Sequence, residues 1–296
     1  MPSHDERPLH FIYHVPKCAG RTIDHHLTDA LPRHAYHRMQ KRRGLGRFVT
    51  GYDPSYLPNA EMVRAVSGHH LGLSLDCLFP NRSIKRSLLL RDPASHFVSY
   101  YNYRMTRYIG EGLKPYAIDV AYGAMRRNFI THYILANFLE LNWAQIASLS
   151  DQDKYDLVNA FLSMFWFVGD YGLCDELLAN LADDFGISAD APAQNTLADL
   201  ARGAGWRPLT LGMLPKRVLA AIRAENQIDQ SLWETWGDVR HETGAVRPVP
   251  LAPRGTSFIS NEAVRFVNQI LRRMQRRWGV LGAPAPIPQE DPAIAT

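Results

Sequence analysis

The chain has 296 residues, of which 46% are hydrophobic and 21% charged, and its formal net charge is +4. This composition is ordinary for a globular protein with a sizeable core. The weak positive charge suits anionic ligands, but it is too small to indicate a nucleic-acid-binding protein.

The cysteines and the apolar runs of the sequence indicate in which cellular environment the protein is expected. Cys18, Cys77 and Cys174 are odd in number and widely spaced, which argues against a disulfide framework and a cysteine-type zinc site. No apolar segment precedes the first predicted strand, and the run 161–168 is too short to cross a bilayer. We therefore expect no signal peptide, no transmembrane segment and a reducing, cytoplasmic setting.

The first predicted elements form a strand, a tight turn and a helix. An apolar run over 9–15 stops at Pro16, and a helix is predicted over 23–31. The turn between them contains Lys17 and Gly20. Backbone N–H groups and the helix dipole at such a helix start favour an anion, so the turn predicts a phosphate or sulfate site. It is not the Walker loop, because Lys17 precedes the glycine.

The middle of the chain predicts a second such turn. The basic segment 34–47 is interpreted as a loop, and a short apolar stretch over 62–66 follows it. Residues 86–90 predict a strand buried on both faces of a parallel sheet. Arg-Asp-Pro ends this strand at Arg91, and a helix is predicted over 94–105.

The remaining elements continue the alternation of strands and helices. One further strand is predicted over 165–168, and helices are predicted over 116–141, 151–162, 173–185 and 215–236. The pattern indicates an α/β fold with a central parallel sheet flanked by helices. Ligands in such folds bind outside the carboxyl ends of the strands, where Lys17, His69 and Arg91 fall.

The domain organisation follows from composition. We expect one α/β domain over 1–245. Residues 246–296 are expected to form a proline-rich linker, a basic amphipathic helix over 261–278 and a tail. The oligomeric state cannot be inferred from this pattern.

Two strand-to-helix turns each combine a cation with a hydroxyl. The first has Lys17 with Thr22, and the second has Arg91 with Ser99, about two helical turns further on. A ligand with two separate phosphates would explain both turns. For Arg91 the alternative is a local salt bridge with Asp92 that closes the strand.

These residues resemble a known family. The stretch 16–22, PKCAGRT, resembles the PKxxGxT loop of the membrane-associated type of sulfotransferases, which includes the heparan and uronyl 2-O-sulfotransferases and bacterial relatives. The stretch 88–93, LLLRDP, with Phe97, Ser99, Tyr100 and Tyr101 is similar to the family signature RDPxxRxxSxY. Weaker similarities lie at 167–169 and 226–232.

The resemblance implies a P-loop-like three-layer fold and 3′-phosphoadenosine 5′-phosphosulfate as sulfuryl donor. The 5′-phosphosulfate would lie on the loop Lys17, Cys18, Ala19, Gly20, Arg21 and Thr22, and the 3′-phosphate on Arg91 and Ser99. The acceptor would be a hydroxyl of a carbohydrate or another hydroxylated molecule. Arg21 and His96 depart from the family pattern.

Catalysis would require a base and a cation on the leaving phosphate. Lys17 suits the second role. For the base we favour His69, because the animal 2-O-sulfotransferases carry His-Gly-His where this chain has Ser67-Gly-His69. His70 would be a substitute base or a substrate contact. The alternative is that both are ordinary loop histidines.

Arg127 and Asn128 resemble a position near the acceptor or adenosine site of the family. A purely structural role on the predicted helix is an equal alternative.

Two other classes of function remain open. A nucleotide-dependent kinase would need Mg²⁺ ligands, for which Asp92 is the candidate. A non-catalytic module would bind a phosphorylated nucleotide or polyanion without a base. The closely spaced pairs His25–His26 and His34–His37 have no carboxylate or cysteine partner in a recognised pattern, so we predict no metal.

Overall fold

A computed structural model describes residues 8–39, 60–79, 82–190 and 207–238. The chain divides into two compact units, which are described separately. The first comprises residues 1–92, 128–194 and 227–254, and the second 93–127, 195–226 and 255–296. The predicted domain boundary at 245 and the predicted helix over 261–278 lie outside the described residues.

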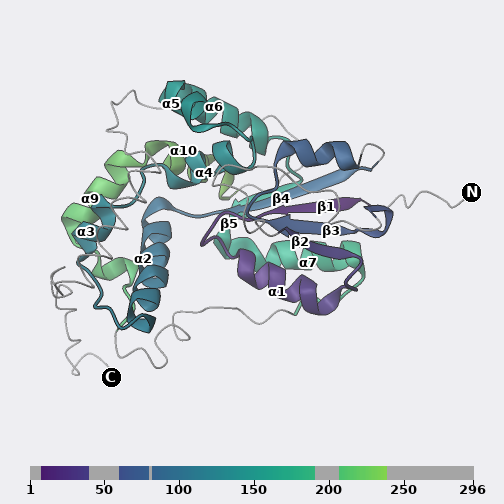
Figure 1. The fold of residues 1–296 in the computed structure, drawn as a ribbon, viewed down its shortest axis with the longest axis horizontal. Coiled ribbons are helices and arrows are strands. Elements are labelled where there is room, and N and C mark those ends of the chain that lie inside the picture. The colour runs from purple at the N-terminus through teal and green to yellow at the C-terminus, as the bar shows by residue number, and fades with distance from the viewer. Residues whose placement is uncertain (1–7, 40–59, 80–81, 191–206, 239–296) are drawn as a thin grey trace, which may run out of the picture. The chain divides into compact units, whose positions relative to one another are not determined.

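The first unit is built on a five-stranded, all-parallel sheet (Figure 1). The strand order is β2-β3-β1-β4-β5, so β1 lies at the centre. Every residue of β1 is buried, which requires cover on both faces of the sheet. The strands are β1 (Leu9–Tyr13), β2 (Tyr36–Met39), β3 (Ala65–Gly68), β4 (Ile84–Leu90) and β5 (Phe167–Asp170).

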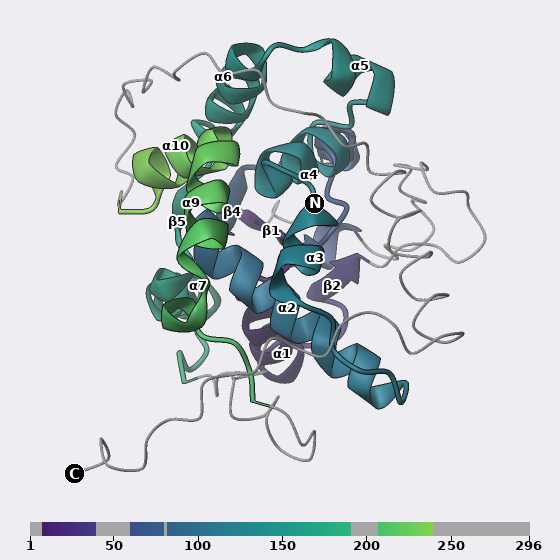
Figure 2. The ribbon, with the colours of Figure 1, turned by 90° about the vertical axis from the view of Figure 1, so that its left-hand side faces the viewer.

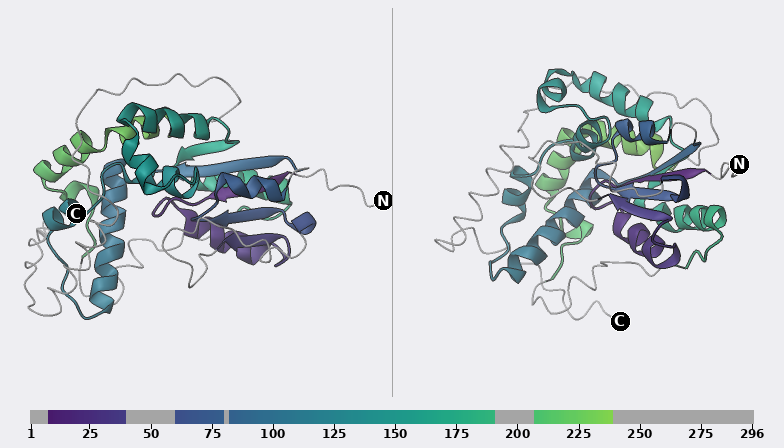
Figure 3. Two further views of the ribbon diagram at one scale, coloured as in Figure 1. Left: turned by 45° about the horizontal axis from the view of Figure 1, so that its top comes forward. Right: turned by 45° about the vertical axis from the view of Figure 1, so that its right-hand side comes forward.

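Helices of the same unit cover the two faces of this sheet. Figures 1 and 3 show α1 (Gly20–Ala30) and α7 (Cys174–Phe185) on one face, and α4 (Phe129–Asn137), α6 (Asp151–Leu162) and α10 (Gln227–Trp236) on the other. The short α5 (Trp143–Ser148) precedes α6 in the chain and contacts α4. The predicted fold class, α/β with a central parallel sheet flanked by helices in a P-loop-like three-layer arrangement, is confirmed.

The second unit is helical in its described residues. It contains α2 (Pro93–Gly110), α3 (Ile118–Gly123), the 3₁₀ turn η5 (Leu211–Met213) and α9 (Lys216–Glu225), which Figure 2 shows around α2. The buried Asn102 amide joins α2 to the approach to η5. Its nitrogen donates to the carbonyl of Leu209, and its oxygen accepts from the Leu209 N–H, both at 2.8 Å.

Three sequence predictions differ from the structure. The segment 34–47, interpreted as a loop, contains the edge strand β2 at residues 36–39, where a half-buried pattern replaces the apolar run of a central strand. The single helix predicted over 116–141 is two helices, α3 and α4, separated by Asn128 at φ 47°. The helix predicted over 215–236 is broken at Asn226 into α9 and α10.

Asn128 and Asp229 explain why one of these breaks is stable. The Asn128 side-chain oxygen accepts from the backbone N–H groups of Ile228 and Asp229 at the start of α10. The Asp229 carboxylate accepts in return from the N–H groups of Ile130 and Thr131 at the start of α4. Asn128 therefore caps α10, Asp229 caps α4, and two N–H groups at each helix start are satisfied.

Two further features are the absence of a membrane-spanning helix from the described ranges and the state of two cysteines. No helix within the described ranges is long and apolar enough to cross a membrane. Cys18 and Cys174 are both buried thiols and form no disulfide.

Candidate functional site

The connection between β1 and α1 turns sharply around Lys17. The Cys18 N–H donates to the Val15 carbonyl at 3.2 Å, and Lys17 and Ala19 take positive φ angles of 72° and 55°. A left-handed conformation costs a residue with a side chain on the order of 1 kcal/mol. Such a turn is retained only where surrounding contacts hold it, so its supports are informative.

Arg91 is one of those supports. It lies directly after β4, and its guanidinium Nη1 donates to the Lys17 carbonyl at 3.0 Å. The Tyr171 ring, directly after β5, lies 3.8 Å from the guanidinium carbon. Arg91 is thus held on one side by the loop after β1 and on the other by the residue after β5, with Lys17 and Arg91 drawn to the same edge of the sheet.

The electrostatics of this loop favour an anion. Burial lowers the pKa of the Lys17 ammonium, and the nearby cations Arg91 and Arg21 lower it further. The loop leads into the start of α1, whose first turn contains no acidic residue and no side-chain cap. Clustered cations and a helix N-terminus are both stabilised when an anion binds between them. The arrangement therefore fits a phosphate or sulfate group.

Cys18 lies inside this loop but has no role in reactivity. Its thiol is buried, and burial raises its pKa to about 12. A neutral, enclosed thiol is neither a nucleophile nor a metal ligand. We conclude that Cys18 packs the loop against the core, while its backbone remains part of the predicted cradle.

His69 follows β3 at the same edge of the sheet. Its Nδ1 lies 2.7 Å from the carbonyl oxygen of His14. Because a carbonyl only accepts, Nδ1 bears the proton and Nε2 has the lone pair. Burial, assisted by the His14 imidazole, lowers the pKa of His69 to about 4, so the ring is neutral at neutral pH. His69 therefore has the tautomer and charge that a base requires.

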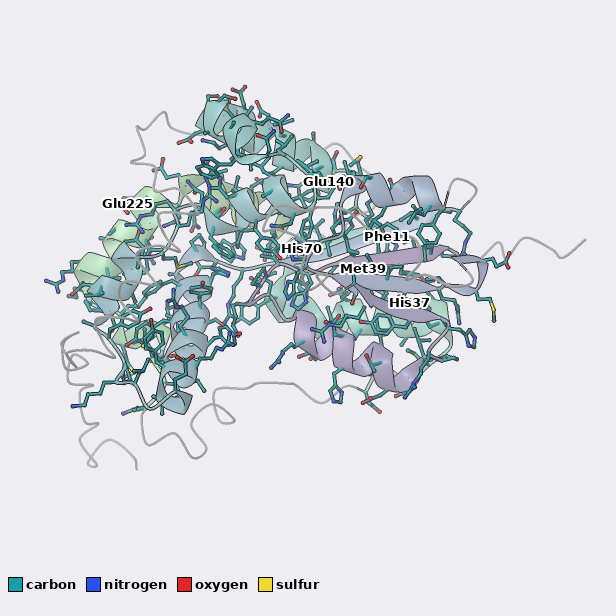
Figure 4. All side chains as sticks on the ribbon, in the orientation of Figure 1. Phe11, His37, Met39, His70, Glu140 and Glu225 are labelled. Carbon is teal, nitrogen blue, oxygen red and sulfur yellow. The ribbon has the colours of Figure 1, made fainter. Side chains whose placement is uncertain are left out.

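His70 is oriented by a different helix. Its Nδ1 donates to the side-chain oxygen of Asn137 at 2.9 Å, and the Asn137 amide donates to the Tyr133 carbonyl. The Tyr133 hydroxyl in turn donates to the His69 carbonyl at 2.8 Å. Figure 4 labels His70 where the strands end. Both histidines are thus held by α4, and the prediction that one contacts substrate stays a prediction.

The other predicted site residues divide between the two units. Ser99 is half-buried on α2 and belongs to the second unit, as does Arg127. The Arg127 guanidinium is paired with Glu225, donates to the Tyr122 carbonyl and lies 3.9 Å from the Tyr122 ring. Asn128 belongs to the first unit and caps α10. The structure thus gives Arg127 and Asn128 structural contacts, and their predicted substrate contacts stay predictions.

Two residues of the site were missed by the sequence analysis. His14 precedes the predicted cradle, and Asp24 lies on α1 with its carboxylate 3.7 Å from the His14 Nδ1. The buried side of α1 comprises Gly20, Ile23, Asp24, His26 and Leu27. A carboxylate within such a helical stripe needs buried partners, and this was the available signal for a polar network beneath the loop.

Comparison with known proteins adds no further constraint. No protein-family model, curated protein or solved structure matches this chain significantly. In the described part of the chain, no group of three or more metal-ligating side chains is found.

Proposed function

We propose that the protein is a sulfotransferase that moves a sulfuryl group from 3′-phosphoadenosine 5′-phosphosulfate to a hydroxyl of a carbohydrate or another hydroxylated acceptor. One observation supports it above all: Lys17, Arg91 and His69 lie after three adjacent strands, β1, β4 and β3, at one edge of one sheet. Two cations for an anionic donor and a neutral imidazole for a hydroxyl acceptor are what sulfuryl transfer needs.

The proposed reaction is a direct displacement at sulfur. The acceptor oxygen forms a bond to sulfur while its proton passes to Nε2 of His69. The bond between sulfur and the bridging oxygen of the 5′-phosphate breaks, and that oxygen leaves with the electron pair. Lys17 stabilises the charge that develops there, because a compact ammonium is attracted to a localised negative charge.

The donor residues are proposed in two groups. The loop Lys17 to Thr22 and the start of α1 hold the 5′-phosphosulfate, and Arg91 holds the 3′-phosphate. The Tyr171 ring keeps the guanidinium of Arg91 in one plane, which favours the same bidentate contact in each binding event. His70 is assigned to the acceptor side, with Asn128 of the same unit. The cytoplasmic setting is part of the same proposal and rests on the cysteine pattern.

Calorimetry of nucleotide binding tests this proposal. The purified protein is titrated with adenosine 3′,5′-bisphosphate and, separately, with ATP and Mg²⁺. We expect tight binding of the bisphosphate and weak binding of ATP. Tighter binding of ATP would contradict the proposal and favour a kinase. Tight bisphosphate binding with no sulfuryl transfer to any hydroxylated acceptor would favour a non-catalytic binding module.

A further inference from the structure

His14 contacts His69 in two ways at once. The two imidazole rings are stacked, with centroids 4.0 Å apart and planes inclined by 24°. The backbone carbonyl of His14 also accepts the hydrogen bond from the Nδ1 of His69. The ring contact fixes the plane of the His69 ring and the carbonyl fixes its tautomer. A single residue thus determines where the Nε2 lone pair lies.

His14 is itself held by the sheet and by Asp24. Its backbone N–H donates to the Gly68 carbonyl at 3.0 Å, which extends the pairing of β1 with β3 by one residue. Its ring Nδ1 faces the Asp24 carboxylate at 3.7 Å. The side chains of His14 and Asp24 are both buried, so the Asp24 carboxylate is shielded from water. The His14 ring has little freedom to move away from His69.

Asp24 is held by three further groups. It accepts from the hydroxyls of Ser67 and Tyr36 and lies 2.9 Å from the Arg38 guanidinium. Burial would raise the pKa of Asp24, but the hydrogen bond from Ser67 and the nearby His14 and Arg38 outweigh it and hold the pKa below its usual range. Asp24 is therefore a carboxylate at neutral pH.

Gly20 connects this group to the anion loop. A side-chain carbon added at Gly20 would lie 1.8 Å from the His14 ring, so the ring occupies the space beside the first residue of α1. The absence of a side chain at Gly20 therefore has a structural reason within the protein itself. It lets the His14 ring lie between the start of α1 and His69.

From these contacts we infer that His14, anchored by Asp24, is a positioning residue that holds the His69 base in register with the anion loop. The inference rests on the proposed function, because His69 is a base only if transfer occurs. His14 acts through His69, whereas His69 would contact the acceptor itself.

The charges around His69 give this inference a directional test. The titratable groups that face it are His14, from the loop after β1, its neighbour His70, and Asp24, from α1, while the hydroxyl of Tyr133 on α4 donates to its carbonyl. Burial and the two histidines lower the pKa of His69, and Asp24 raises it. Removing the His14 ring and removing the Asp24 charge should therefore shift this pKa in opposite directions.

The experiment compares His14→Asn, Asp24→Asn and the control His25→Asn. His25 lies on the exposed side of α1, where its ring pairs with Asp29, so it matches the other changes in type and location. The pKa of His69 is measured by NMR titration of its ring. We expect a rise in His14→Asn, a further fall in Asp24→Asn and no change in the control. Mere loosening of the site would instead raise the pKa in both variants.

Activity gives a second readout. Loss of positioning should lower kcat of His14→Asn by about tenfold or more, with bisphosphate affinity changed by less than about twofold. The acid limb of the kcat profile should move with the NMR pKa. If Asp24→Asn does not fold, the kcat of His14→Asn is compared with that of His25→Asn, and an unchanged kcat in His14→Asn would contradict the inference.

The two ways of failing are distinguishable. If the unmodified protein transfers sulfuryl groups and His14→Asn retains both its turnover and the His69 pKa, the inference about His14 is wrong and the proposed function stands. If the unmodified protein does not bind the bisphosphate, the proposed function is wrong and the assignment of His14 to a base is withdrawn with it.

Discussion

The two ends of the parallel sheet in the first unit each contain a buried histidine whose pKa is lowered to about 4. His10 lies near the amino end of β1, and His69 follows the carboxyl end of β3. In both cases burial is the largest cause. The same pKa therefore arises in two places with different surroundings, and the value alone does not identify a catalytic group.

The two ends of the sheet differ in which charged side chains lie close together. At the amino end, the His10 ring lies between Trp166 and Phe185, 3.1 Å from the Asp184 carboxylate, which also binds Lys85 at 2.6 Å. At the carboxyl end, the charges that act on Lys17 are mainly the cations Arg91 and Arg21. At the amino end Asp184 offsets the cation that it binds, whereas at the carboxyl end Lys17 lies near two further cations. The comparison indicates that like charges gathered at a strand end mark a ligand site better than a shifted pKa does.

The largest expected effect is on turnover. His69→Ala should lower kcat by about 10²–10⁴, because it removes the proposed base, while bisphosphate affinity is retained. His25→Ala, on an exposed histidine of α1, is the control and should retain full activity. Turnover is measured with the sulfuryl donor and a carbohydrate acceptor. Normal turnover in His69→Ala with loss in His70→Ala would move the base to His70.

The second-largest expected effect is on the stability of the fold at acid pH. It concerns His10, at the amino end of the sheet. The folded-state pKa of His10, about 4, lies below its usual value of 6.5, so the unfolded chain binds the proton more readily. Stability from neutral His10 is then fully present above pH 6.5 and declines as the pH falls towards about 4. The loss amounts to at most about 3 kcal/mol.

Urea denaturation between pH 7 and pH 4 measures this loss. His10→Gln should reduce the dependence of the unfolding free energy on pH, because glutamine has no proton to gain. His25→Gln, on an exposed histidine, is the control and should leave the dependence unchanged. An equal pH dependence in His10→Gln and the unmodified protein would show that the cluster around Asp184 tolerates a charged His10.

Substitutions at two arginines distinguish an effect on ligand binding from an effect on folding stability. Arg91→Ala should weaken bisphosphate binding by about tenfold to a hundredfold, the effect of losing charge-assisted hydrogen bonds. The matched change at the amino end is Arg64→Ala. The Arg64 guanidinium donates to the Asp184 and Phe185 carbonyls at the end of α7.

Arg64→Ala should leave bisphosphate affinity unchanged and lower the unfolding free energy by about 1–2 kcal/mol. Calorimetry and urea denaturation of both variants measure the two effects. Weaker bisphosphate binding in Arg64→Ala, or unchanged binding in Arg91→Ala, would remove the distinction between the two ends.

The parts of the fold that sequence predicted well are those with local causes. The buried run of β4 and the helix over 151–162 were predicted because apolar periodicity and capping residues are local patterns. α6 spans Asp151–Leu162 with a capping box formed by Ser150 and Asp153, so the prediction for this helix is confirmed at both ends. β2 was missed because an edge strand needs only one buried face, and its basic neighbourhood resembles a loop.

The site was predictable only in part, for a related reason. Arg91 and His69 stand directly after β4 and β3, Lys17 follows β1 within four residues, and parallel strands place such residues at one edge. His14 and Asp24 act through a ring stack and a buried carboxylate, contacts between residues that no spacing rule links. Asn128 was assigned to substrate from a resemblance, while its side chain caps a helix 100 residues away in sequence.

The smallest expected effect compares two lysines at opposite ends of the sheet. Lys85 pairs with Asp184 and lies 4.7 Å from the centre of the Trp166 ring. Lys85→Met should lower the unfolding free energy by about 1 kcal/mol or less, since the ammonium is partly exposed. Burial and the nearby cations Arg91 and Arg21 instead lower the pKa of Lys17, so its charge is less favourable in the folded chain than in the unfolded chain. Lys17→Met should therefore leave the stability of the ligand-free protein unchanged or raise it by a few tenths of a kcal/mol.

Urea denaturation of both variants, with and without the bisphosphate, checks this contrast. Without ligand the two substitutions should act in opposite directions, and the difference should shrink as salt screens the charges. With the bisphosphate present, Lys85→Met should be the more stable of the two variants, because it retains the cations that bind the ligand and is stabilised by that binding. If Lys17→Met lowers ligand-free stability as much as Lys85→Met does, then Lys17 is a structural cation like Lys85, and the site at the carboxyl end loses its main electrostatic argument.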